Sequence, residues 1–187
     1  LEEALLRLDA RNWCIINEGS PDSIVMGISG KPEVLLNLPL VADAKIPVIK
    51  RCSGGGTVVV DSNTLFVTFI FNEEAIGLPC YPEPIMKWSG SFYKRVFEHP
   101  DFQLRENDYV FGARKCGGNA QYFRKNRWLH HTTFLWDYDE RKMGYLLLPP
   151  KMPDYRQGRM HSDFLCRLRE FFPSKAVVME NAVEVLK

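Results

Sequence analysis

Residues 47–71 read PVIKRCSGGGTVVVDSNTLFVTFIF, and this stretch decides the fold class. Its β-branched and aromatic runs at residues 47–51, 57–60 and 65–71 predict three strands. The run at 65–71 is apolar on both faces, which is typical of a strand in the interior of a sheet. The first two strands are joined through three consecutive glycines, so we expect a connection whose backbone can adopt conformations that other residues disfavour.

Working outward, short strands and a few helices alternate along the chain. Strands are predicted at residues 13–16, 23–28, 102–104, 109–111 and 129–136, and helices at 1–8, after Pro32, at 85–97 and at 163–172. Pro39 is expected to weaken the helix after Pro32, and Ser162 is the expected N-cap of the last helix. This order predicts an α+β fold in which helices flank mixed, mostly antiparallel sheets.

Composition excludes several classes of protein. The 187 residues are 45% hydrophobic and 25% charged, which suits a packed core and is unlike a disordered chain. No apolar run approaches the roughly 20 residues that cross a bilayer. Lys and Arg number 24 against 23 Asp and Glu, so no overall field would hold nucleic acid or a membrane. We therefore expect neither as a partner, and any anion must be bound locally.

The five cysteines are widely spaced, with no C-x-x-C pair and no Cys and His at the spacing of a zinc site. We expect no resident metal and no disulfide framework. This pattern favours a soluble intracellular protein in a reducing compartment, and it leaves open whether that is the cytoplasm or an organelle.

The segment 50–57, KRCSGGGT, is the first candidate binding segment. Glycines permit positive φ and close approach to a ligand, and successive N–H groups can form a nest for an anion. Lys50 and Arg51 would supply positive charge. The segment is neither a Walker loop nor a dinucleotide-binding loop, because no G-x-x-x-x-G-K-[ST] and no G-x-G-x-x-G is present. A tight connection between strands is the alternative.

The second candidate segment is GARKCGGNAQ at 112–121, followed by Arg124, Lys125 and Arg127. Residues 111–130 carry five positive charges and no negative one. Lys115 is expected to face a carboxylate or phosphate oxygen, with the following glycines making room. For the three later basic residues we favour a solvated hairpin, and RNA contact is the least favoured alternative.

Two further side chains are candidates on chemical grounds. Cys116 is a possible nucleophile because the neighbouring Lys115 can lower a thiol pKa, although a small residue filling a loop is the interpretation we favour. The pair His130 and His131 begins an apolar strand without carboxylates at metal-ligand spacing, which favours a structural role over a metal site.

Three ordered motifs resemble a known family. They are R-x-S-G-G-G-T-V at 51–58, N-D-x-x-x-G-x-[RK]-K-x-x-G-N-A-Q at 107–121 and H-H-T-T-F-L at 130–135. Together they are similar to the catalytic domain of lipoate-protein ligases, in the biotin and lipoate ligase superfamily. The likeness also includes EEALL at 2–6 and PDYRQGR at 153–159. It implies a single catalytic domain over 1–187, without the small C-terminal accessory domain of the bacterial ligases.

The resemblance implies transfer of lipoate or octanoate to a lysine of a lipoyl domain, in a 2-oxoacid dehydrogenase or the glycine cleavage H protein. In the ligase branch the acid reacts with ATP and Mg²⁺ to give an acyl-adenylate, which the acceptor lysine then attacks. A separate accessory subunit is left open. Lys115 matches the essential lysine of the family. The residues implied to bind the substrate or the adenylate are Arg51, Ser53, Gly54, Gly55, Gly56, Thr57, Asn119, Ala120 and His131.

Other functions stay open beside this one. Relatives place a His before the Asp that follows the glycine motif, whereas here Val60 precedes Asp61, which favours a ligase-fold protein that binds without catalysing. A second alternative is an octanoyl transferase that takes its acyl group from acyl carrier protein, through Cys116 or without a covalent intermediate. Biotin ligases are similar at the level of the fold only, because the glycine and arginine loop typical of those enzymes is missing.

Overall fold

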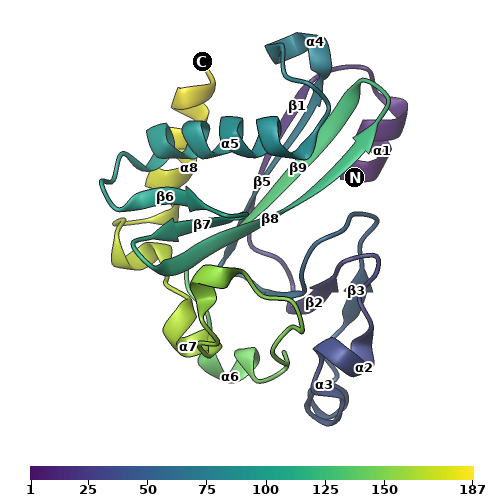
Figure 1. Cartoon of the computed structure of the whole chain (residues 1–187), viewed down its shortest axis with the longest axis vertical. Coiled ribbons are helices and arrows are strands. Elements are labelled where there is room, and N and C mark those ends of the chain that lie inside the picture. Colours follow the sequence, from purple (N-terminus) through teal and green to yellow (C-terminus); the bar gives the residue numbers. More distant parts are fainter.

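The computed structural model describes residues 1–187 and contains a six-stranded and a three-stranded sheet (Figure 1). The large sheet has the order β1-β5-β9-β8-β7-β6, and all neighbouring strands are antiparallel. Its strands are β1 (Trp13–Glu18), β5 (Thr64–Asn72), β6 (Phe102–Arg105), β7 (Asp108–Phe111), β8 (Arg114–Arg124) and β9 (Arg127–Leu135). The predicted α+β class is confirmed, and β5 is an interior strand as expected.

The small sheet has the order β3-β2-β4 and includes the parallel pair β2–β3. Its strands are β2 (Ser23–Met26), β3 (Val48–Lys50) and β4 (Val58–Val60). Two helices, α2 (Pro32–Leu35) and α3 (Leu38–Ala44), connect β2 to β3 and supply Leu35 and Val41 to a small core. The predicted helix after Pro32 is interrupted at Leu36 and Asn37, and Pro39 lies in the first turn of the second piece, where a helix needs no N–H.

The main core lies between the large sheet and two helices, α5 (Pro82–Phe97) and α8 (Lys175–Leu186), which cross one face of the sheet (Figure 1). α5 buries Phe92, Val96 and Phe97 there, as its predicted apolar stripe required. On the opposite face, α1 (Glu2–Leu8) packs Leu6 against the sheet. None of the helices combines the length and the apolar composition that a membrane crossing requires.

The predicted helix at 163–172 is wrong. The chain instead forms α7 (His161–Phe164) and the 3-10 turn η2 (Leu168–Glu170), separated by residues 165–167, of which Leu165 and Arg167 are extended. The Cys166 N–H donates to the Lys115 carbonyl at 2.9 Å, so the backbone pairs with β8 rather than continuing the helix. Ser162 lies inside α7 and caps nothing. The remaining short elements are α4 (Glu73–Ile76), α6 (Glu140–Met143) and the 3-10 turn η1 (Asp154–Arg156).

β8 runs through the glycine-rich segment that the sequence analysis treated as a loop. Its pairing with β7 shifts by one residue at Cys116, which forms a β-bulge. Side chains alternate between the faces of a regular strand, so one extra residue changes which later positions share a face. The bulge places Lys115 and Gly118 on one face of the sheet, and Cys116 and Gly117 on the core face.

Candidate functional site

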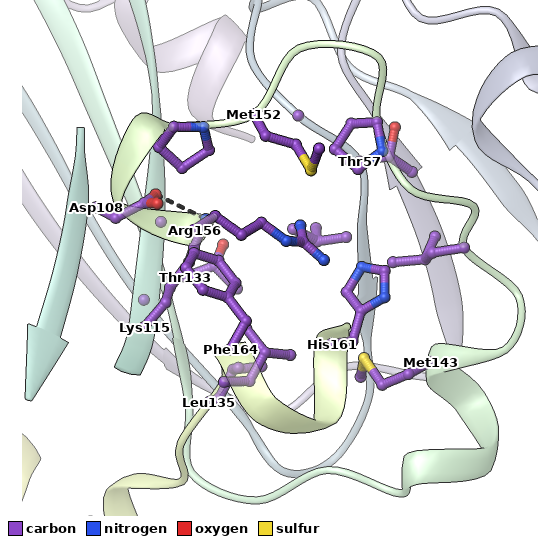
Figure 2. A pocket seen from close by; sticks show the side chains of 18 of the residues that line it. Thr57, Asp108, Lys115, Thr133, Leu135, Met143, Met152, Arg156, His161 and Phe164 are labelled. Atoms are coloured by element: carbon purple, nitrogen blue, oxygen red, sulfur yellow. Dashed lines mark ion pairs between the residues drawn. The ribbon is translucent and has the colours of Figure 1, made fainter. Parts of the chain in front are cut away.

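A cleft lies between the two sheets and the segment 143–165, which we name the strap. It has two adjoining lobes of about 440 and 400 Å³. The first is bounded by the glycine segment 51–57 and is named the loop lobe. The second is bounded by the strap and is named the strap lobe (Figure 2). The residues that line both lobes, and so mark their junction, are Gly56, Thr57, Val58, Asn107, Asp108, Lys115, Gly118 and Thr133.

Lys115 stands at the junction, where it is accessible from both lobes. Its ammonium lies 2.7 Å from Oδ1 of Asp108, and Figure 2 draws this ion pair as a dashed line. A Cβ atom on Gly118 would lie only 3.2 Å from Lys115 Nζ. The absence of a side chain at residue 118 therefore leaves room for the Lys115 side chain to lie over the strand. A compact cation held in this way can stabilise developing negative charge without reorganising.

Asp108 also fastens the strap. Its Oδ2 accepts a hydrogen bond from the Tyr155 hydroxyl at 2.8 Å. Burial and the Asp108 carboxylate raise the pKa of Tyr155 well above its usual value, so this hydroxyl remains a donor. Next to it, the Glu106 carboxylate accepts from the N–H groups of Asp154 and Tyr155 at 3.2 and 3.1 Å. Lys115 and the docked strap therefore share one carboxylate.

Arg51 shapes the glycine segment. Its Nη2 donates to the carbonyl oxygens of Gly54 and Gly56, both at 2.8 Å, and its Nε donates to Ser53 Oγ at 3.1 Å. The guanidinium lies at the wall of the loop lobe, yet these carbonyl oxygens occupy most of its N–H groups. Gly55 has φ +105°, and a Cβ atom there would lie 2.7 Å from Arg51 Nη2, so this position requires glycine.

The structure brings together all of the predicted site residues except Gly54, which lines neither lobe. Asn119 donates from Nδ2 to the Asn107 carbonyl at 2.7 Å, which ties β8 to the β6–β7 turn. Ala120 and Ser53 form part of the wall of the loop lobe. The Thr57 hydroxyl is buried without a hydrogen-bond partner, and this residue faces both lobes.

The two neighbouring histidines differ in environment. His131 lines the loop lobe, and its Nδ1 lies 2.9 Å from the Glu2 carboxylate. His130 points into the core, where its Nε2 lies 2.8 Å from the Tyr109 hydroxyl. Burial lowers the pKa of His130 to about 3, so it is a neutral structural residue.

Cys116 lies on the core face of β8 and does not reach the cleft. Its side chain is 0% exposed, and its Sγ lies 3.2 Å from the Tyr109 carbonyl. Burial raises the pKa of this thiol well above its usual value, which opposes formation of the thiolate. The thiol that lines the loop lobe is that of Cys52, which the sequence analysis did not single out.

The basic hairpin between β8 and β9 has a structural role. Arg124 donates to the Arg7 carbonyl at 3.1 Å, and Arg127 donates to the Ala10 and Arg11 carbonyls at 2.9 and 2.8 Å. These bonds fasten the chain that leaves α1. Arg124 and Arg127 are thus engaged with the protein's own backbone, whereas the sequence had favoured a solvated hairpin.

Asp108, Arg156 and His161 are among the charged or titratable residues of the cleft that sequence reasoning missed. Burial, together with the positive charges of Arg156 and Lys115, lowers the pKa of His161. The signals were present, because Asp108 belongs to the N-D motif and Arg156 to PDYRQGR. Neither residue had been given a chemical role, since only the fold brings Asp108 and Arg156 to the cleft that Lys115 lines.

The sequence and the fold match a known class of domain. The family model described as the lipoyl protein ligase A/B catalytic domain matches residues 1–187, so the chain belongs to that family. Among the similar proteins is the "Inactive lipoate–protein ligase 2" of Plasmodium falciparum, 31% identical over 189 residues, with 82% of this chain and 49% of that protein covered. The lipoate-protein ligase LplJ of Bacillus subtilis is 27% identical over 139 residues, covering 73% and 40%. The chain thus spans about half the length of the curated relatives it matches.

Solved structures support the fold. A lipoate-protein ligase A bound with ATP superimposes with a TM-score of 0.81 at 15% identity, covering 99% of this chain and 76% of that one. A lipoate protein ligase of Thermoplasma acidophilum with bound lipoic acid has a TM-score of 0.78 at 16% identity, covering 99% and 76%. At such low identities the likeness concerns the arrangement of the chain alone.

Proposed function

We propose that this chain is a lipoate- or octanoate-protein ligase that transfers the acyl group to a lysine of a lipoyl domain through an acyl-adenylate. The observation that carries the proposal is the position of Lys115, fixed by Asp108 at the junction of two lobes. A substrate that spans both lobes would have its reacting carbonyl beside the ammonium. The names of the relatives support lipoate as the acid and ATP as the activating substrate.

The charges of the lobes indicate which part of the adenylate each would hold. The loop lobe carries the carboxylates of Glu2 and Glu3 among apolar walls, so it suits a neutral acyl chain better than a phosphate. The strap lobe carries Lys151 and Arg156 among apolar walls, which suits a nucleotide with its planar base and its negative charge. Lys115 would then touch the bond between the two parts.

Both steps of the proposed reaction develop negative charge at that point. First, the acid carboxylate attacks the α-phosphorus of ATP, the α–β phosphoanhydride breaks, and pyrophosphate leaves. Second, the acceptor amine attacks the acyl carbonyl, the bond to AMP breaks, and the amine gives up a proton. Lys115 would stabilise the oxygens that gain charge in each step. Mg²⁺ is proposed to enter with ATP, as its usual counterion.

A mass measurement tests the proposal directly. The protein is incubated with a lipoyl domain and either lipoate or octanoate, with and without MgATP, and the lipoyl domain is then weighed. We expect the mass of one acyl group to be added only in the presence of MgATP. A parallel incubation with octanoyl acyl carrier protein and no ATP identifies a transferase. Acylation in that arm alone would contradict the adenylate route.

A second candidate is a protein that keeps the fold and binds the acyl ligand without catalysis. The P. falciparum relative is named inactive, and Val60 is buried at the wall of the loop lobe where the family has a His. This candidate predicts binding of a stable acyl-adenylate analogue without any acylation. It further predicts that Val60→His introduces measurable transfer, whereas the ligase proposal expects transfer from the unmodified chain.

The carrier-protein alternative leads to a prediction on Cys116. We expect Cys116→Ser to keep most of the activity and no acyl-thioester to form at this position, because the thiol is buried on the face opposite the cleft. The measurement is the intact mass of the protein after incubation with octanoyl acyl carrier protein without ATP. An octanoyl adduct mapped to Cys116 would contradict this prediction, while one mapped to Cys52 would move the covalent hypothesis to the loop lobe.

The glycine segment provides a prediction that separates binding from folding. A Cβ atom on Gly56 would meet no atom within 4 Å, and this residue lines both lobes. Gly56→Ala is therefore expected to change the midpoint of thermal unfolding by at most about 2 °C. A methyl group in an occupied cleft should weaken binding of a stable acyl-adenylate analogue by about 5- to 100-fold. The matched control is Gly55→Ala, which should lower stability as well because φ is +105°. Unchanged affinity for Gly56→Ala would show that no ligand passes this point.

A further inference from the structure

A series of hydrogen bonds crosses the main core on the side of the large sheet that faces away from the cleft. Ser89 from α5, Tyr109 from β7 and His130 from β9 are all 0% exposed. The Tyr109 hydroxyl lies 2.7 Å from Ser89 Oγ and 2.8 Å from His130 Nε2. The other ring nitrogen of His130, Nδ1, lies 3.1 Å from the side-chain amide nitrogen of Gln121 on β8. We name these four residues the core network, and they join α5 to three neighbouring strands (Figure 1).

The donors and acceptors of the core network can be assigned in one direction. Ser89 Oγ donates to the Met86 carbonyl at 2.9 Å, so its lone pairs accept the proton of Tyr109. The Tyr109 oxygen then accepts from His130 Nε2, and His130 Nδ1 accepts from the Gln121 amide. Burial raises the pKa of the Tyr109 hydroxyl and lowers the pKa of His130 to about 3. Both groups are therefore neutral, and His130 carries its proton on Nε2.

The core network acts on a strand whose register is weakly specified. β8 contains Gly117 and Gly118, and a strand with glycines has few side chains that fix its pairing. A slip of one residue would exchange the two faces of β8 and turn Lys115 toward the core. Gln121 and His130 are direct partners in the pairing of β8 with β9. The hydrogen bond between their side chains is possible only in this register.

Tyr109 connects the same network to the bulge and to the ion pair of the cleft. The pairing of β7 with β8 changes register between Tyr109 and Val110. The Tyr109 carbonyl accepts from the Cys116 thiol at 3.2 Å. The preceding residue, Asp108, holds the ammonium of Lys115 at 2.7 Å on the cleft face. Fixing the Tyr109 side chain in the core therefore fixes the backbone from which the Asp108 side chain extends.

We propose that His130 is a positioning residue, which fixes the register of β7, β8 and β9 and so holds Lys115 beside Asp108. His130 lines neither lobe of the cleft and acts through Tyr109 and Gln121. The inference rests on the proposed function for the reaction that this geometry serves, whereas the tautomer and the register can be measured without turnover. A merely structural histidine would contribute to stability and leave the reaction rate of the folded protein unchanged.

A set of core variants tests the proposal by kinetics. His130→Phe keeps a ring and removes both hydrogen bonds, and Tyr109→Phe removes the hydroxyl alone. The double variant removes the same link from both ends. His130→Gln is the conservative variant, because its amide can again donate to Tyr109. The matched control is Phe92→Leu, since Phe92 belongs to the same core and lies outside the core network. The thermal midpoint, and kcat and KM for lipoate in acyl transfer, are measured for each.

We expect kcat of His130→Phe to fall by about 3- to 10-fold with KM for lipoate unchanged, because Lys115 shifts by part of 1 Å while the loop lobe keeps its walls. Tyr109→Phe should show the same loss, and the double variant should lose no more than either single one. His130→Gln should recover part of the rate. Phe92→Leu should lower the thermal midpoint and keep kcat.

Nitrogen-15 NMR of the histidine rings measures the tautomer directly. The protein has four histidines, and the signals of His130 are those that disappear in His130→Gln. We expect a proton on Nε2 and none on Nδ1 throughout the range from about pH 5 to 8, since the pKa of about 3 lies below it. A proton on Nδ1, or a titration within this range, would contradict the direction of the core network.

Amide hydrogen exchange measures the register without any reaction. In His130→Phe the exchange of residues 114–121 in β8 should increase more than that of β5, whereas in Phe92→Leu both strands should change together. If the unmodified chain transfers no acyl group, the ligase proposal fails and the tautomer and the exchange still decide the inference. Unchanged exchange in β8, unchanged kcat in His130→Phe, or additive losses in the double variant would overturn it.

Discussion

Lys115→Ala is expected to reduce acyl transfer to the lipoyl domain by about 10³-fold, the effect of removing a donor from a site of charge development. The fold should persist, because Lys115 lies in the cleft and Asp108 keeps its hydrogen bond from Tyr155. A loss of about 1 kcal/mol from the partly exposed ion pair corresponds to a midpoint lower by about 2–4 °C. Transfer rates by mass spectrometry and a thermal unfolding scan provide the two measurements.

The neighbouring Arg114 is the matched control for this prediction. It is a cation on the same strand, and it pairs with Glu170 at 2.8 Å outside the cleft. Arg114→Ala should therefore keep the transfer rate. Lys115→Arg should not restore activity, because a planar guanidinium replaces a compact ammonium beside Gly118. Full activity in Lys115→Ala would remove this lysine from the site.

The adjacent glycines of β8 are expected to give opposite results when each is replaced by alanine. A Cβ atom on Gly117 would lie 2.5 Å from the ring of Phe134, a core residue, and 3.0 Å from the Thr133 carbonyl. Overpacking of this kind costs about 1–3 kcal/mol, so Gly117→Ala should lower the thermal midpoint by several degrees. The cleft side of the strand should be little changed in that variant.

Gly118→Ala should instead reduce activity with little effect on stability. Its Cβ atom would lie 3.2 Å from Nζ and 3.3 Å from Cε of Lys115, so the lysine must move away from Asp108. A displacement of about 1 Å at a reacting centre lowers rates by about 100-fold, so a shift of a few tenths of an ångström is expected to lower the transfer rate by a few-fold. The two variants are compared by calorimetry and by the transfer assay. If both lost stability and kept activity, the assignment of the two strand faces would be wrong.

Much of the fold was predictable because local signals agreed with the tertiary arrangement. The strand at 65–71 and the helix at 85–97 carry apolar patterns that only one packing satisfies. The segment 163–172 has equally good helical periodicity, yet pairing of Cys166 with Lys115 interrupts it. β8 was missed for the opposite reason, because glycine and charge lower strand propensity while pairing with β7 and β9 imposes the strand.

Site residues were predictable only where the residue type itself, such as a lysine among glycines, indicates a chemical role. Lys115 and the glycine segment lie where the motifs indicated, at the cleft. The sequence suggested that Arg51 would bind an anion. In the structure, the carbonyl oxygens of Gly54 and Gly56 accept hydrogen bonds from its Nη2, which no local sequence pattern reveals. Arg156 was overlooked because its place in the cleft is a property of the folded strap and of no sequence pattern.

The shared carboxylate of Asp108 couples closure of the strap to the state of Lys115. One oxygen holds the ammonium and the other holds the Tyr155 hydroxyl, so a ligand that draws Lys115 toward itself alters the acceptor on which strap docking depends. Thermodynamic linkage makes this effect reciprocal: opening the strap must change the affinity of Lys115 for its ligand by the same factor. Under the proposed function, release of product and loosening of the strap would then be coupled through the Asp108 side chain.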